Sequence, residues 1–168
     1  MQRHEFKALY RTHAGELLGY LRRRGAGDAA PDLLAETFLT AWRRRSDLPD
    51  AVNRRAWLFG TARRLLLAHR RTSQQVTPVD DLDDLPSRRP DAPADSMRED
   101  LVRQALTRLP EVDRELLTLT VWERLPIVEA AVVVGLSANA ARVRLHRARK
   151  RLADDPTLRD AIQSTPAP

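Results

Sequence analysis

An acidic, proline-rich segment divides the chain at residues 72–97. It reads TSQQVTPVDDLDDLPSRRPDAPADSM, with four prolines, six acidic side chains and two basic ones. Because so few of its side chains are large and apolar, burial cannot offset the conformational entropy that the segment would lose on ordering. We therefore expect a flexible acidic linker at 72–97, with one small domain on each side of it.

The segment before the linker has the apolar spacing of three helices. Apolar side chains recur at steps of three and four residues, the period of one buried helical face. GAGD at 25–28 separates the first helix from the second, and SDLPD at 46–50 separates the second from the third, which runs into HRRT. No stretch alternates apolar and polar residues as a half-buried strand does. The predicted inward positions are Phe6, Leu9, Tyr10, His13, Leu17, Leu21, Leu33, Leu34, Thr37, Phe38, Ala41, Trp42, Trp57, Leu58, Thr61, Ala62, Leu65 and Leu66.

The segment after the linker predicts four more helices. One apolar helix ends near Pro110, and EVDRELLTLTVWERL forms the next. Pro126 suits the first turn of a third helix, IVEAAVVV. Gly135 then supplies a left-handed turn residue and Ser137 a cap for the fourth helix, which is the layout of a helix-turn-helix. The expected fold class is all-α, with two small helical domains.

The fourth of these helices is the most basic part of the chain, with six Arg or Lys residues in ANAARVRLHRARKRL. Steps of four, three and four residues predict that one side of it faces the core, through Ala141, Leu145, Ala148 and Leu152. Arginines on the other sides could bind guanine edges, each worth about 1–3 kcal/mol of discrimination, or neutralise phosphates. A solvated arginine-rich face is the alternative. The residues on the other sides are Asn139, Arg142, Val143, His146, Arg147 and Arg149.

Composition narrows the functional classes. The chain has 29 basic and 23 acidic side chains, a net charge of +6, which fits a polyanion-binding protein or an arginine preference set by a GC-rich genome. It has no cysteine, which excludes disulfides and thiolate zinc sites. The start of the chain lacks a signal peptide, and no apolar run approaches about 20 residues, so we expect a cytoplasmic protein without membrane insertion. We find no nucleophile–base pair or Gly-rich phosphate loop and expect neither enzymatic activity nor a cofactor.

Three motifs resemble regions of bacterial sigma factors. DLLAETFLTAWRR at 32–44 resembles the region-2 helix that docks on core RNA polymerase, and RAWLFGTARRLLLAHRR at 55–71 resembles the helix that follows it. ALTRLPEVDRELLTLTVWERLPIVEAAVVVGLSANAARVRLHRARKRL at 105–152 resembles region 4. A two-domain chain without a separate region 3 is similar to the extracytoplasmic-function group of the sigma-70 family. The resemblance implies an RNA polymerase sigma factor, which directs promoter recognition and transcription initiation.

The resemblance also divides the chain. It places region 2 at residues 1–71 and region 4 at residues 98–155, with a tail at 156–168. In region 2, the helix that carries Asp32 and Glu36 is implied to dock on the β′ clamp of the polymerase. These two carboxylates are four residues apart, on one helical face. Without the resemblance, such a pair is ordinary solvated surface. The implied core-binding residues are Asp32, Leu33, Glu36, Phe38 and Trp42.

The third helix and the loop before it correspond to the part that captures the melted −10 element. The resemblance implies that the melted strand is held by phosphate contacts and a flipped-out base. Asn53 is the best hydrogen-bonding candidate for the base pocket. Arg64 and Ala68 replace the usual Asn and Asp, so the base preference at this site is open. The implied −10 residues are Asn53, Arg54, Arg55, Arg63, Arg64, Arg70 and Arg71.

In region 4 the recognition helix is implied to bind the −35 element. Ala140 and Val143 stand where Thr and Ser are frequent, so two hydroxyl contacts are lost. His146 is either a base-edge donor or a surface residue. It is not expected to bind a metal, because no second His or carboxylate lies at ligand spacing on its face of the helix. The implied −35 residues are Ser137, Asn139, Arg142, Val143, Arg144, His146 and Arg147.

The implied partners are core RNA polymerase, through the β′ clamp and the β flap, promoter DNA, and an anti-sigma factor. The β flap would contact the apolar surface of residues 101–122. The acidic linker is either a mimic of RNA phosphates near the exit channel or a solvated spacer. Two rival functions stay open: a degenerate sigma-like module that sequesters an anti-sigma factor or polymerase, and a stand-alone helix-turn-helix regulator.

Overall fold

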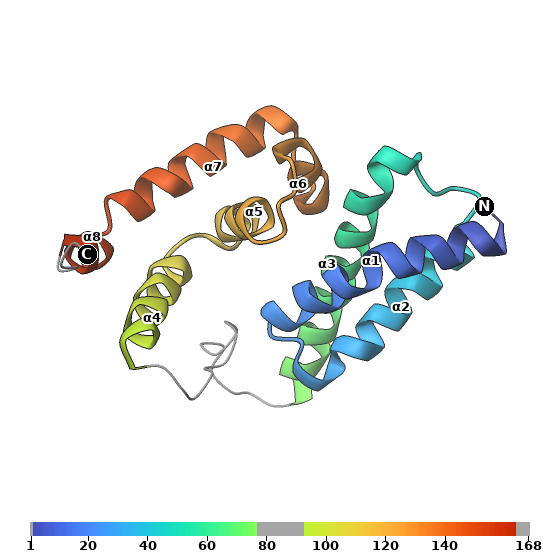
Figure 1. Ribbon diagram of the computed structural model, residues 1–168, viewed down its shortest axis with the longest axis horizontal. Helices are drawn as coiled ribbons and strands as arrows, with labels where there is room; N and C mark the ends of the chain where they lie inside the picture. Colours follow the sequence, from blue (N-terminus) through green and yellow to red (C-terminus); the bar gives the residue numbers. More distant parts are fainter. Residues whose placement is uncertain (1, 77–92, 164–168) are drawn as a thin grey trace. The chain divides into compact units, whose positions relative to one another are not determined.

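A computed structural model describes residues 2–76 and 93–163, and every regular element in these two ranges is helical (Figure 1). The chain divides into a first unit at residues 1–86 and a second unit at residues 87–168. The all-α prediction is confirmed, and so is the presence of two small helical domains. The linker was predicted to be flexible at 72–97, and residues 77–92 of it lie outside the described ranges.

The first unit is a bundle of α1 (Arg3–Arg23), α2 (Ala30–Arg43) and α3 (Ala51–Val76), with a short 3-10 turn, η1 (Gly27–Ala29), before α2. Each of the three long helices packs against the other two (Figure 1). Tyr20 and Phe59 meet edge to face in the core, with ring centroids 5.2 Å apart. The largest fully buried side chains here are Leu17, Tyr20, Leu21, Thr37, Leu58 and Phe59.

The predicted inward face of α1 is only partly buried. Leu9, Leu17 and Leu21 are in the core as expected. Tyr10, in contrast, is 45% exposed, because it faces an open groove beside α2 rather than the core under α3. The break after α1 was predicted correctly, and two of its glycines have positive φ, Gly25 at 74° and Gly27 at 51°.

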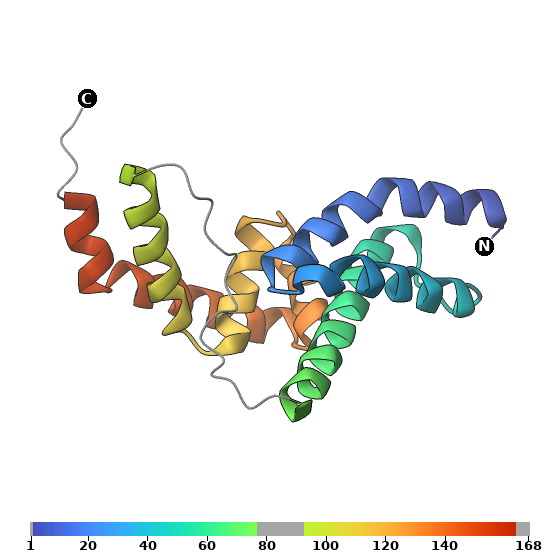
Figure 2. The same ribbon diagram turned by 90° about the horizontal axis from the view of Figure 1, so that it is seen from below.

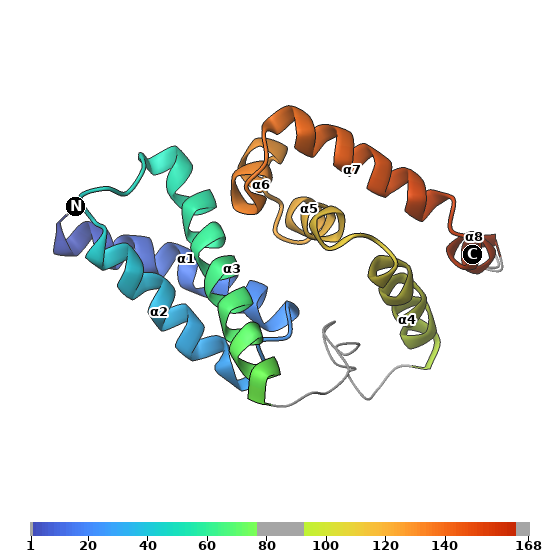
Figure 3. The same cartoon turned by 180° about the vertical axis from the view of Figure 1, so that it is seen from behind.

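The second unit contains α4 (Pro93–Thr107), α5 (Glu111–Val121), α6 (Ile127–Val134), α7 (Ala138–Ala153) and α8 (Pro156–Gln163). α7 packs on both α5 and α6, as Figure 3 shows from behind. The core between them includes Leu116, Leu119 and the small residues Ala130, Ala141 and Ala148, all less than 1% exposed. Small side chains at these crossings let the helices approach closely.

The turn between α6 and α7 has the predicted chemistry. Gly135 ends α6 in the left-handed conformation, with φ 74° and ψ 33°, where a side chain would strain the backbone. The amide of Leu136 donates to the carbonyl of Ala131 at 2.9 Å, which satisfies one of the free carbonyls at the helix end. Ser137 caps α7, and its Oγ accepts a hydrogen bond from the Ala140 amide at 3.2 Å. The helix-turn-helix is therefore present, with α7 as its second helix.

Helical structure extends into the segment predicted as linker and into the tail. α3 continues to Val76 and α4 begins at Pro93, so five residues at each end of 72–97 are helical. In the tail, α8 lies beside α4 (Figure 2). Asp155 begins α8, since its Oδ1 accepts the amides of Thr157 at 3.0 Å and Leu158 at 3.3 Å. An Asp before a Pro is the usual start of a helix, so this signal was present in the sequence.

Candidate nucleic-acid and polymerase interfaces

The outer face of α7 presents polar and basic side chains to solvent. The helix buries Ala141, Leu145 and Ala148 against α5 and α6, which leaves the opposite side of α7 free. An α-helix turns by 100° per residue, so side chains three and four positions apart share that free side. Five of the residues predicted to bind the −35 element are exposed there: Asn139, Arg142, Val143, His146 and Arg147.

The other two predicted −35 residues have partners inside the second unit. The Ser137 hydroxyl oxygen is used by the helix cap. Arg144 lies at the flank of the buried face, and its Nη1 donates to Asp113 Oδ1 on α5 at 2.7 Å. Arg151 reaches the other carboxylate oxygen, with Nη1 3.4 Å from Asp113 Oδ2. The seven predicted residues thus do not form a single surface.

The outward face of α3 carries part of the predicted −10 site. Asn53, Arg64 and Arg71 are all exposed, and their spacings of eleven and seven residues are close to three and two helical turns, so they lie along one line. Trp57 lies between Asn53 and Arg64 on this side and is half-buried, although its spacing placed it with the inward residues. Trp57 is therefore a further side chain on this face that the periodicity argument missed.

Hydrogen bonds hold two members of this row. The Asn53 amide nitrogen Nδ2 donates to Asp50 Oδ1 at 2.8 Å, and the same oxygen accepts the backbone amide of Asn53 at 3.1 Å. Arg64 Nη2 donates to the hydroxyl of Thr61 at 3.0 Å, one turn earlier on α3. The backbone at the start of α3 and the guanidinium of Arg64 are consequently positioned rather than free in solvent.

The remaining predicted −10 arginines are more enclosed. Arg54 Nε donates to the carbonyl of Pro49 at 3.1 Å, in the loop before α3. Arg70 donates through Nη2 to the carbonyl of Arg24, at the end of α1. Arg63 is half-buried. These side chains link α3 to its surroundings in the first unit, so they are set apart from the exposed row.

Arg55 belongs to a charged cluster between α1 and α3. Its guanidinium is bidentate with Glu16, with Nε 3.1 Å and Nη2 2.8 Å from Oε2, and it lies 5.4 Å from the centroid of the Phe59 ring. His13 Nδ1 is 2.5 Å from the other oxygen of Glu16. Burial disfavours the charged carboxylate, but the hydrogen bonds from His13 and Arg55 outweigh it and hold the pKa of Glu16 below its ordinary value of 4.5. The cluster stabilises the first unit.

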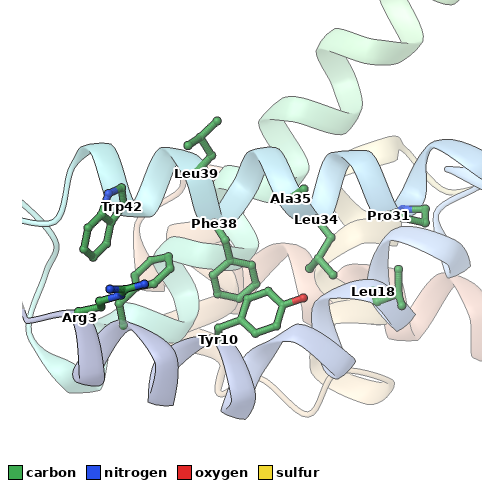
Figure 4. Close-up of a pocket in the computed structure, with 10 residues that line it drawn as sticks. Arg3, Tyr10, Leu18, Pro31, Leu34, Ala35, Phe38, Leu39 and Trp42 are labelled. Atoms are coloured by element: carbon green, nitrogen blue, oxygen red, sulfur yellow. The ribbon is translucent and has the colours of Figure 1, made fainter.

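An apolar groove of about 700 Å³ runs between α1 and α2 (Figure 4). Aromatic side chains form its floor: the Tyr10 ring lies 4.7 Å from that of Phe38, and the Phe6 ring lies 5.0 Å from that of Trp42, between centroids. In Figure 4, Leu39 points away from α1, on the outer side of α2. The lining residues are Arg3, Phe6, Tyr10, Leu18, Pro31, Leu34, Ala35, Phe38, Leu39 and Trp42.

The residues predicted to bind core polymerase occupy three positions around α2. Phe38 and Trp42 line the groove. Asp32 is exposed on the outer face, and Glu36 is half-buried there, with its Oε1 3.6 Å from Nη1 of Arg43. Leu33 is only 8% exposed, so it supports the helix from inside.

The α1 side of the groove was missing from the sequence-based site. Phe6 and Tyr10 come from α1 and complete the aromatic floor with Phe38 and Trp42 of α2. Two aromatic residues four positions apart on the first helix were the available signal, but the same spacing also describes a core face. Whether such a face lines a groove or lies in the core depends on how the two helices pack, and periodicity alone does not specify that packing.

The apolar side chains of residues 101–122 are largely internal to the second unit. Leu116 and Leu119 are fully buried. Val102 is 44% exposed on α4, and Val121 and Trp122 are 54% and 40% exposed at the end of α5. These three are the exposed large apolar side chains of the predicted β-flap surface.

The described ranges contain neither a membrane-spanning helix nor a metal-ligand cluster. Among residues 2–76 and 93–163, no helix combines the length and hydropathy required to span a bilayer. In the same residues, no three His, Asp or Glu side chains cluster as metal ligands do.

Comparison with known families matches both units. The family model "Sigma-70 region 2" matches residues 9–76, and "Sigma-70, region 4" matches residues 99–152. The first match covers α2, α3 and most of α1, and the second covers the helix-turn-helix. The sequence motifs predicted these two regions in this order.

Individual proteins agree with this assignment. The chain is 37% identical over 142 residues to the ECF RNA polymerase sigma factor SigF of Caulobacter vibrioides, covering 82% of this chain and 78% of SigF. In structure it resembles CnrH, solved in complex with the cytosolic domain of CnrY, with a TM-score of 0.63, 27% identity, and 95% of this chain and 90% of CnrH covered. It also shares its fold with the sigma factor RpoE of Bartonella quintana, solved in complex with the anti-sigma factor NepR, with a TM-score of 0.65, 22% identity, and 89% and 95% of the two chains covered. The chain therefore belongs to the extracytoplasmic-function group of the sigma-70 family: it is an RNA polymerase sigma factor, which binds core polymerase and directs promoter recognition and transcription initiation.

Proposed function

We propose that this sigma factor reads the −35 element with the outer face of α7. The observation that carries the proposal is the set of exposed side chains opposite the buried face of that helix, with Arg142 and Arg147 as its cations. The second helix of a helix-turn-helix enters the major groove, where an arginine can donate two hydrogen bonds to a guanine edge. Asn139 and His146 add shorter polar groups on the same face, suited to adenine or guanine acceptors.

The −10 element is assigned to the outward face of α3. Asn53, Arg64 and Arg71 offer one amide and two guanidinium groups along a line. Guanidinium groups hold the phosphates of a separated strand, and the half-buried Trp57 beside them offers an aromatic surface for an unstacked base. Arg55, in contrast, is engaged with Glu16, so its role is to fix α3 on α1.

Core polymerase is assigned to α2 and the groove beside it. Asp32 and Glu36 present two carboxylates on the outer face, and the half-buried Trp42 presents aromatic surface in the groove, which the buried Phe38 also lines. A charged rim beside an apolar cleft is typical of a protein–protein interface. Val121 and Trp122 in the second unit are the exposed apolar residues available to the β flap.

The chain itself supplies no catalytic group in this proposal. RNA synthesis is carried out by the polymerase, and the sigma factor contributes binding and positioning alone. Because its partners are RNA polymerase and promoter DNA, the site of action is the cytoplasm. Membership of the sigma-70 family supports both statements.

An anti-sigma factor is the further partner that we infer. CnrH shares its fold and 27% sequence identity with this chain, and it was solved in complex with the cytosolic domain of CnrY. The groove between α1 and α2 contains residues of the proposed core-binding surface, so a protein bound there would compete with polymerase. Competition between purified core polymerase and a candidate anti-sigma factor for the labelled chain would measure this directly.

The assignment of α7 is tested by separating DNA binding from polymerase binding. We expect the double variant R142A/R147A to bind core polymerase with unchanged affinity, while its holoenzyme loses promoter retention by at least tenfold, from two contacts of about 1–3 kcal/mol each. The matched control is R159A, which removes an exposed arginine from α8. Equal promoter retention by R142A/R147A and R159A would contradict the assignment.

A further inference from the structure

A buried carboxylate joins the recognition helix to the helix beneath it. Asp113 lies in the first turn of α5 and is only 4% exposed. Both of its oxygens face α7: Oδ1 is 2.7 Å from Nη1 of Arg144, and Oδ2 is 3.4 Å from Nη1 of Arg151. Burying a charge is costly unless it is paired, so a packing of α7 that moved both arginines away would leave this carboxylate unpaired by them.

The two arginines are placed to limit the movement of α7. They are seven residues apart, which is close to two helical turns, so both lie on the flank of the helix beside its buried face. If α7 rolled on α5, or slid along it, both hydrogen bonds to Asp113 would be lost. The buried residues Ala141 and Ala148 are small, so Leu145 is the long apolar side chain among the three buried residues of α7. Asp113 adds a directional contact to this apolar packing.

We propose that Asp113 is a positioning residue for −35 recognition and that Arg144 holds α7 in place instead of contacting DNA. The Asp113–Arg144 pair sets the rotation of α7, and through it the direction in which Asn139, Arg142 and Arg147 point. Specificity across the whole −35 element then depends on a carboxylate that never touches the DNA. This inference deepens the proposed function and rests on it.

The first test compares sequence selection by holoenzymes. Full-length wild type, D113N and R144Q are each assembled with core polymerase and allowed to select from a duplex pool randomised over the −35 element, in an otherwise fixed promoter. A positioning pair predicts that D113N and R144Q weaken the preference at every position of the element together, by roughly tenfold for the element as a whole. Both variants lose the charged 2.7 Å hydrogen bond that orients α7, and R144Q leaves Asp113 with only the longer contact to Arg151. A double variant should be no worse than either single one.

A base contact by Arg144 predicts a different pattern. R144Q would then change the preference at one base step, while D113N, which frees Arg144, would leave the selected sequence unchanged. That result would overturn the inference. A wild-type holoenzyme that selects no sequence would instead overturn the proposed function, and the inference with it.

The salt dependence of promoter binding provides a second readout. Loss of a phosphate-binding arginine lowers the slope of log K against log salt by about one, because fewer counterions are released. We expect R144Q to keep the wild-type slope. A lowered slope in R144Q would assign Arg144 to the DNA and contradict its positioning role.

Control variants separate this role from general stability. D155N removes the charge from the 2.8 Å ion pair with Arg108, elsewhere in the same unit, while its amide oxygen can still cap α8. It should leave base preference unchanged. R144K keeps the charge and should recover part of the selectivity that R144Q loses. If D113N does not fold, as judged by circular dichroism, the R144Q and R144K arms decide the question by the same two readouts. Broadened preference in D155N would overturn the specific role of Asp113.

Discussion

Glu16 is a partly buried carboxylate whose ionisation is coupled to the stability of the first unit. Its side chain is 28% exposed and holds His13 on α1 and Arg55 on α3. Burial opposes its charge, yet the two hydrogen-bonding partners keep the pKa of Glu16 below 4.5. A carboxyl group with a lowered pKa contributes stability above its unfolded pKa, and that contribution is lost as the pH falls through the folded value.

We therefore predict that E16Q destabilises the first unit by about 1 kcal/mol at pH 7, since a partly exposed charged pair is worth that order. The difference from wild type should shrink as the pH falls below 4.5. Urea unfolding in a W122F background, in which Trp42 and Trp57 report the first unit, measures both effects. D28N, at an exposed carboxyl of the same unit, should change stability by less than about 0.5 kcal/mol. An equal loss in E16Q at pH 7 and pH 3.5 would contradict this account.

At the residue scale, the sequence predicted which side chains carry charge but not which charges are already paired. Arg142, Arg147 and Arg64 are exposed as the helical periods implied. Arg144 and Arg55 were assigned to DNA by the resemblance to sigma factors, yet each has a carboxylate partner 31 or 39 residues away in the chain. A helical period orders residues around one axis, whereas a pair of this kind depends on how two helices cross.

The turn of the helix-turn-helix depends on the conformation of Gly135. With φ at 74°, this residue occupies a region that side chains enter only with strain. We predict that G135A destabilises the second unit by about 1 kcal/mol or more. Gly15, in the middle of α1, has open space around it and an ordinary helical φ, so G15A should stabilise α1 by about 0.5–1 kcal/mol.

Urea unfolding reports the two glycine variants separately. Fluorescence of Trp122 in a W42F/W57F background follows the second unit, and Trp42 and Trp57 in a W122F background follow the first. The opposite signs expected for G135A and G15A exclude a general effect of replacing glycine by alanine. A G135A protein as stable as wild type would show that the left-handed turn is not required at this position.

The Ser137 hydroxyl caps the start of α7. Ser137 Oγ accepts the Ala140 amide at 3.2 Å, which satisfies one of the free donors at the helix start. S137A should therefore destabilise the second unit by about 1 kcal/mol, and S137D, which retains an acceptor, should recover most of that loss. The Trp122 signal measures both. Failure of S137D to recover stability would exclude capping as the role of this hydroxyl.

Helices were the part of the structure that the sequence predicted best. IVEAAVVV coincides with α6, and the residues that stop α1 and begin α7 were identified by their turn and cap chemistry. The helices beside the linker are longer than predicted, since α3 reaches Val76 and α4 begins at Pro93. The residues there are mostly polar and show no apolar period. The groove beside α2 depends on packing between α1 and α2, so no single element could reveal it.

At the scale of the whole molecule, polymerase binding and −35 binding are assigned to different units. Charge reversal in the first unit should therefore weaken polymerase binding and leave −35 binding unchanged. We predict that D32R/E36R lowers affinity for core polymerase by roughly tenfold or more, through loss of attraction and new repulsion. Binding of the full chain to a −35 duplex should remain within about twofold of wild type.

The matched control is D47R, which reverses an exposed carboxylate in the loop after α2. Titration of labelled chain with core polymerase, and separately with the duplex, measures both affinities. Unchanged core affinity in D32R/E36R would show that the outer face of α2 is not the docking surface. If D47R and D32R/E36R lost equal affinity for core polymerase, net charge alone would explain the effect.

The measurement that tests the account most directly is transcription in vitro with purified core polymerase, this chain and a library of promoter fragments. The account predicts defined transcripts that appear only when the chain is added, start at fixed positions, and share a −35 and a −10 element upstream. Core binding without any transcript would contradict promoter recognition and favour a sequestering module. Binding of DNA without binding of core would contradict the assignment of the first unit and favour a stand-alone regulator.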